Sequence, residues 1–177
     1  AEGAEEVEEQ QPGKIEAEHY DEGAPGKAYY DVDKKNVGAD YREVTQVDIE
    51  RRSDASNGHG IGWTRKDEWL NYSVEVKESG TYAIEIPVAS KKMGGLFVLK
   101  IEGKAICLPI QIPDTGGWDK LKVIKCAGVK LTKGRHVIRV VMLEQGQSGS
   151  IGDIDYFKFV KTLRVPKPPP LKRRQDG

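Results

Sequence analysis

Three acidic residues near the two ends of the chain have types and spacing that suggest cation binding. Glu16 and Glu18 lie in the segment KIEAEHY, and Asp155 lies in DIDYFKF. Side chains alternate between the two faces of a strand, so Glu16 and Glu18 are expected to share a face, and Asp155 to share the face of the two phenylalanines after it. A carboxylate that faces a core is costly unless it is compensated. If the two segments lie side by side, the carboxylates converge, and oxygen ligands of this kind predict Ca²⁺.

A simpler interpretation stays open for the first two carboxylates. Glu16 and Glu18 are also what the solvent-facing side of an edge strand would carry, and on the pattern alone this arrangement is the commoner one.

Two aromatic residues lie in glycine-flanked segments and could form a binding surface. Tyr41 lies in GADYR and Trp118 in TGGWD. A tryptophan beside two glycines cannot easily reach a core, so we expect an exposed, flat surface in a loop. The alternatives are that Trp118 covers the core edge and that Tyr41 is a half-buried strand residue.

The elements that must position these residues are short strands. The residues expected to face inward follow a period of two, and they are Leu70, Tyr72, Val74 and Val76, then Tyr82, Ile84, Ile86 and Val88, then Phe97, Leu99 and Ile101, then Ile138, Val140 and Met142. Glycine-containing turn signals separate these runs, and no long segment has a helical period. The pattern predicts an all-β fold, a β-sandwich or a barrel, in which the first and last strands lie close together.

Charge and composition exclude several classes of partner. The chain has 177 residues, with 28 Lys+Arg and 28 Asp+Glu, so its net charge is zero. Nucleic acids and anionic membranes are therefore not expected as partners, because both favour a basic surplus. There is no apolar run of about 18 residues, as a membrane span requires.

The chain divides into one domain with two tails. Residues 1–12 are acidic and predict a disordered leader. Residues 161–177 are rich in proline and basic residues, which predicts a linker to a neighbouring domain. Residues 13–160 are expected to form the folded domain. The start of the chain has no secretory signal pattern, so we expect a mature or excised piece of a longer protein.

The two cysteines, Cys107 and Cys126, flank a segment that contains Gly116-Gly117. A hairpin that closes at these glycines would bring the cysteines together, and a disulfide is one interpretation. The other is a pair of small buried apolar residues.

Seven segments in order resemble carbohydrate-binding module family 6. They are IEAEHYDEG at 15–23, AYYDVDKKNVGADYR at 28–42, VDIE at 47–50, GWTRKDEWLNYSVEVKESGTY at 62–82, IQIPDTGGWDKLKV at 110–123, GVKLTKGRHVIRVV at 128–141 and GDIDYFKF at 152–159. The resemblance implies a jelly-roll sandwich of two antiparallel sheets with a structural calcium. It also implies a secreted, monomeric, non-catalytic module attached to an enzyme that degrades polysaccharides.

The resemblance also assigns roles to particular residues. The calcium ligands fall on Glu16, Glu18 and Asp155, with a main-chain carbonyl near Lys35. The aromatic walls of the family's loop-end cleft fall on Tyr41 and Trp118.

One position departs from the family pattern. Asp153 stands where an asparagine usually hydrogen-bonds the sugar, and an ionised aspartate only accepts hydrogen bonds. Asp40 adds a second acceptor, so a neutral sugar with hydroxyl donors is expected. The alternative is a structural role for Asp153, either in a turn or next to the calcium ligands.

The resemblance implies a polysaccharide ligand such as agarose, xylan or β-1,3-glucan (laminarin), and the aspartate in place of asparagine at position 153 slightly favours agarose, a neutral galactan. An autonomous glycan-active enzyme is a weaker alternative, because Asp40 and Asp153 are its only candidate acid–base pair. A protein-interaction sandwich is the third class, and it would require a larger apolar surface than this composition predicts.

Overall fold

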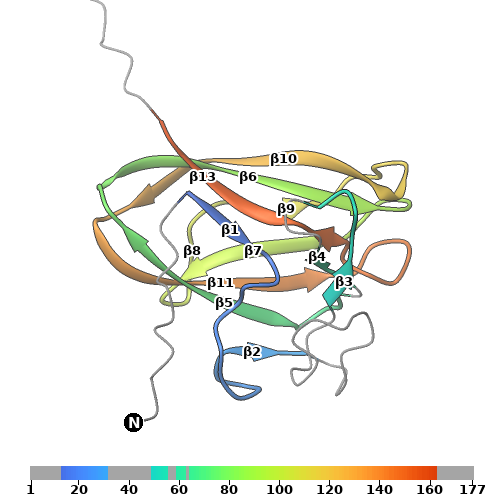
Figure 1. Cartoon of the computed structure of the whole chain (residues 1–177), viewed down its shortest axis with the longest axis horizontal. Helices are drawn as coiled ribbons and strands as arrows, with labels where there is room; N and C mark the ends of the chain where they lie inside the picture. Colours follow the sequence, from blue (N-terminus) through green and yellow to red (C-terminus); the bar gives the residue numbers. More distant parts are fainter. Residues whose placement is uncertain (1–12, 32–48, 56–58, 63, 163–177) are drawn as a thin grey trace, which may run out of the picture.

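The computed structural model describes residues 13–31, 49–55, 59–62 and 64–162. In these ranges the chain forms strands joined by turns and loops, and no helix there could cross a membrane. The strands form two antiparallel sheets that face each other (Figure 1). This confirms the predicted all-β sandwich.

The first sheet has seven strands. They are β1 (Lys14–Glu16), β3 (Ile49–Arg51), β4 (His59–Ile61), β6 (Gly80–Ser90), β10 (Gly117–Leu131), β12 (Asp153–Ile154) and β13 (Tyr156–Lys161). Their order is β1-β13-β6-β12-β4-β3, and β10 pairs with β6 outside this path.

The second sheet has six strands. They are β2 (Tyr29–Tyr30), β5 (Trp69–Val76), β7 (Leu96–Ile101), β8 (Lys104–Ala105), β9 (Ile110–Gln111) and β11 (Gly134–Glu144). Their order is β2-β5-β11-β7-β8, and β9 pairs with β7. The central strand β11 is thus flanked by β5 and β7, which sets the side chains of three strands next to one another on each face.

The core lies between the sheets and consists of the residues that the alternation predicted. The predicted set on β5, β6 and β11 is buried throughout, as are Phe97 and Leu99 of β7, whereas Ile101 is partly buried at its end. Tyr72 packs edge-on against Phe157, with ring centroids 5.3 Å apart, and so joins the two sheets.

The first and last strands pair, as expected. β1 runs antiparallel to β13 with Glu16 opposite Tyr156, and the Ala17 amide donates to the Asp155 carbonyl over 2.9 Å. The expectation that Glu16 and Glu18 share a strand face is wrong, because β1 ends at Glu16. The chain turns there, and the His19 amide donates to the Glu16 carbonyl.

The two cysteines meet, but not through a hairpin. β9 adds to β7 in one sheet, whereas β10 adds to β6 in the other, so the chain crosses between the sheets. Both cysteines are free thiols, Cys107 half-buried and Cys126 buried. A hydrogen bond from Cys126 lowers the pKa of Cys107, and the same contact raises the pKa of Cys126.

Candidate functional site

Trp118 lies at the start of β10, where that strand bulges away from its neighbour. Gly117 pairs with Ser90 and Lys122 pairs with Val88, so β10 advances five residues while β6 advances two. The extra residues cannot all join the ladder, and the bulge carries the indole outward. Trp118 is 36% exposed, which confirms the expected exposure of this side chain.

The turn before Trp118 is fixed by hydrogen bonds. The Thr115 amide donates to the Ser90 carbonyl over 3.1 Å, and the Ser90 amide donates to the Thr115 hydroxyl oxygen over 3.0 Å. The Gly116 amide donates to the side chain of Asp114 over 2.8 Å, and Gly116 has a φ of 93°. Only glycine adopts this conformation readily, so the glycine is required by the turn that presents Trp118.

Arg52 joins three segments beneath this turn. The guanidinium donates through Nη1 to Oδ2 of Asp153 over 2.7 Å and through Nη2 to the Trp118 carbonyl over 2.6 Å. The side chains of Arg52 and Asp153 are each 5% exposed. A buried charge pair of this kind persists only with good geometry, and here it ties the loop after β3 to β10 and β12.

Asp54 is the exposed member of the same network. Its two carboxylate oxygens accept from Nε and Nη2 of Arg52 over 2.9 and 2.8 Å, a bidentate arrangement. The hydrogen bonds from Arg52 hold the pKa of Asp54 below its ordinary value. Asp54 therefore keeps a negative, acceptor-only group at the solvent edge of the network that supports Trp118.

The predicted binding residues have different positions in the structure. Asp153 is buried on β12 and accepts from Arg52. Tyr41 and Asp40 lie outside the described residues, so their place beside Trp118 stays a prediction.

The predicted calcium ligands lie where β1 meets β13. Glu18 is fully buried and Asp155 is 2% exposed, whereas Glu16 is partly exposed and forms an ion pair with Lys14 over 3.3 Å. Buried carboxylates are chemically suited to a hard cation. Within the described ranges, however, no three His, Cys, Asp or Glu residues form a group that could hold a metal. The carbonyl near Lys35 lies outside these ranges, so the calcium site stays a prediction.

Arg52 and Asp54 were missed by the sequence reasoning. The sequence offered one short signal for them, which is the tripeptide Arg-Ser-Asp directly after β3. An arginine in a charged run is usually solvated, and only the return of β12 and β10 to the same end of the sandwich gives Arg52 its partners.

Comparison with known families agrees with this architecture. The model of the family described as "Carbohydrate binding module (family 6)" matches residues 38–161.

Two curated relatives match shorter parts of the chain. The clotting factor G alpha subunit of Tachypleus tridentatus is 33% identical over 86 residues, which is 48% of this chain and 13% of that protein. The beta-agarase AgaA of Microbulbifer thermotolerans is 31% identical over 64 residues, which is 36% of this chain and 14% of that protein. The chain thus corresponds to a small part of each relative.

Solved structures show the same fold. A β-1,3-glucan-binding family 6 module from Bacillus halodurans superposes with a TM-score of 0.64 at 22% identity, and the match covers 85% of this chain and 98% of that module.

Proposed function

This chain belongs to carbohydrate-binding module family 6, and we propose that it binds a neutral polysaccharide in a loop-end cleft between Tyr41 and Trp118. Members of this family are non-catalytic binding modules, so the chain is a carbohydrate-binding module rather than an enzyme. Its affinity must then come from stacking and hydrogen bonds with an intact sugar chain.

The exposed indole of Trp118 is the observation that carries the proposed cleft. A bulge lifts this residue from the sheet, while Thr115 and Arg52 fix the backbone on either side of it. A rigid, flat apolar surface suits the CH face of a pyranose ring, since little entropy is lost when the sugar stacks on it. We propose that Tyr41 provides the second wall.

Polar groups near Trp118 would select the hydroxyls of the sugar. Asp54 has an exposed carboxylate, and its lowered pKa keeps it an acceptor at neutral pH. Asp40 and Asp153 are the acceptors proposed from the family pattern. Asp153 is buried against Arg52, so it would act from the floor of the cleft.

A neutral β-glycan or galactan is the proposed ligand, with agarose slightly favoured. The similarity to a beta-agarase supports agarose, and the similarity to a module named for β-1,3-glucan binding supports that alternative, with xylan as the third. The role proposed for the module is to hold a secreted glycoside hydrolase on its substrate. A tether of this kind raises the local concentration of substrate without any new catalytic contact.

Affinity electrophoresis in gels containing agarose, xylan or laminarin tests this proposal. We expect the chain to be retarded by one of the three, and we expect Trp118→Ala to lose that retardation. Leu108→Ala is the matched control, since Leu108 is 84% exposed and lies on a different segment. Equal retardation of wild type and Trp118→Ala would reject the cleft.

We further propose a structural Ca²⁺ held by Glu16, Glu18, Asp155 and the carbonyl near Lys35. Buried carboxylates at the junction of β1 and β13 support it. A cation there would offset their repulsion and hold the two strands together. Chelation by EDTA should lower the melting temperature and added Ca²⁺ should restore it. An unchanged melting curve for protein that has been exhaustively chelated would contradict the site.

A further inference from the structure

The outer face of the six-stranded sheet carries a groove of about 730 Å³. It crosses β5, β11 and β7, and its lining includes Trp69, Asn71, Lys100 and Arg139. None of these residues belongs to the cleft proposed around Trp118, which is on the other sheet. The groove is therefore a second concave surface with its own chemistry.

Arg139 is held rigidly in this groove. Its guanidinium carbon lies 3.7 Å from the ring centroid of Trp69, and its Nε donates to Oδ1 of Asn71 over 2.9 Å. Asn71 is fixed in turn, because its amide nitrogen donates to the Lys27 carbonyl over 3.2 Å. Stacking and one hydrogen bond thus orient the guanidinium, and its two terminal nitrogens form no hydrogen bond with a residue that the structure describes.

Lys100 lies directly opposite Arg139 across β7 and β11. Both side chains are on the outer face, since their neighbours Leu99 and Val140 point into the core. Like charges in opposed positions on a sheet are destabilising. Within the described part of the chain, neither Lys100 nor Arg139 forms an ion pair with an acidic side chain. The two positive charges therefore give this part of the groove a positive potential.

The rest of the groove does not cancel this charge. Among the residues that the structure describes, its lining contains one acidic residue, Glu102, against three cations, Lys100, Arg139 and Arg135. Arg135 lies opposite Glu75 at the far end of β11. Lys100 and Arg139 are thus the two lining cations that lie opposite each other.

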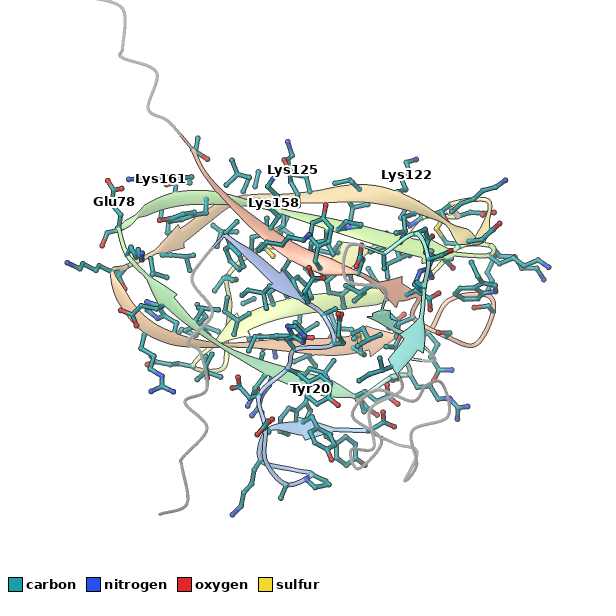
Figure 2. All side chains as sticks on the ribbon, viewed as in Figure 1. Tyr20, Glu78, Lys122, Lys125, Lys158 and Lys161 are labelled. Carbon is teal, nitrogen blue, oxygen red and sulfur yellow. The ribbon has the colours of Figure 1, made fainter. Side chains whose placement is uncertain are left out.

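The lysines of the other sheet are arranged differently. Figure 2 shows Lys122, Lys125, Lys158 and Lys161 along β10 and β13. Lys125 pairs with Glu85 over 3.7 Å, and Lys161 pairs with Glu78 over 2.5 Å. Lys158 lies opposite Glu85 in the register of β13 and β6. That surface mixes both signs of charge, which is ordinary for a solvated face.

We propose that the groove binds an acidic polysaccharide, with a carboxylate or sulfate ester of the chain placed between Arg139 and Lys100. A planar guanidinium and an ammonium together offer several charged donors to such an oxyanion. Val137 and Val141 add apolar surface in the same groove, against which the CH face of the sugar can pack. The site would let the module recognise scattered anionic substituents while the loop-end cleft recognises the neutral chain.

Two pairs of matched polymers test this proposal by affinity electrophoresis and isothermal titration calorimetry. Dextran sulfate is compared with uncharged dextran, and polygalacturonate with its methyl ester. We expect the wild type to bind the charged member of at least one pair. The pair that binds identifies sulfate or carboxylate as the group recognised.

The groove variant Lys100→Gln/Arg139→Gln should weaken that binding by about tenfold or more, because two charge-assisted contacts are lost. The control Lys122→Gln/Lys158→Gln removes the same charge from the other sheet and should change binding less than about twofold, since it touches no groove contact. Arg139→Lys keeps the positive charge but lacks the planar guanidinium, so it should bind the charged polymer weakly. This single variant also tests the groove if the double variant folds poorly. Circular dichroism checks each fold.

Trp118→Ala should retain the binding of charged polymers, so failure of the loop-end cleft and failure of the groove are distinguished. Equal weakening by the groove and control variants would show diffuse electrostatic attraction and overturn the proposal. Absence of binding to all four polymers would overturn it as well.

Discussion

Replacing Arg52 should test whether the buried network that supports Trp118 is formed as described. Arg52→Met keeps the length of the side chain and removes every donor. The Asp153 carboxylate, with its side chain 5% exposed, then loses its charged partner in a site that water hardly reaches. Breaking a buried pair from one side costs about 3–5 kcal/mol. The contact with Asp54 adds little, because that carboxylate is 35% exposed and is screened.

Urea unfolding followed by tryptophan fluorescence would measure this loss. A domain of this size is stable by about 5–15 kcal/mol, so a loss of about 3–5 kcal/mol is large and still measurable. Lys130→Met serves as the control, since it removes an exposed cation from β10 and should change stability by less than about 0.5 kcal/mol.

A double-mutant cycle separates the ion pair from the packing of the arginine. Asp153→Asn in the Arg52→Met background removes the buried carboxylate charge that Arg52 faces and should restore part of the stability, with a coupling of about 1–3 kcal/mol. A loss below about 1 kcal/mol in Arg52→Met, together with no coupling, would refute the reasoning, because it would show that Asp153 does not depend on Arg52 in solution.

Two further predictions concern pH and oxidation. Arg52 lowers the pKa of Asp54 from 3.8, so the pair should stabilise the fold above that value and lose this contribution as the pH falls through the lower folded-state pKa. The unfolding free energies of wild type and Asp54→Asn should therefore differ slightly at neutral pH and converge in acid, and a difference that does not depend on pH would contradict the pairing. Oxidised glutathione should convert the thiols of Cys107 and Cys126 to a disulfide, with two glutathione molecules released and two hydrogens lost from the protein mass. Closing this loop should raise the stability by about 3 kcal/mol, and full alkylation of both thiols after the treatment would exclude the bridge.

Much of the fold could be predicted from the sequence because alternation is a local property. The inward residues of β5, β6 and β11 follow a period of two, so each strand has one apolar face. Burial of that face in the core fixes the orientation of the strand. The first and last strands were also expected to lie close together, and β1 does pair with β13. The exposure of Trp118 was also local, because two glycines precede it and the turn at Gly116 needs a positive φ.

The local pattern failed where the chain leaves the strand period. β1 ends at Glu16, so alternation could not place Glu18. The segment between the cysteines predicted a hairpin, but β9 and β10 join different sheets, and the thiols meet because the sheets stack. The end of β1 and the separation of β9 from β10 do not depend on the neighbouring residue types. Each depends on which distant strand the segment pairs with.

Residue types alone predicted an all-β fold, a sandwich or a barrel, with an exposed aromatic residue after a glycine turn. Tertiary structure decided which charges meet. Arg52 reaches Asp153 across 101 residues of sequence, and Lys100 lies opposite Arg139 only because of the register between β7 and β11. Coulomb interactions depend on distance and on exclusion of water, and for residues so far apart along the chain both are fixed only when the sheets have formed.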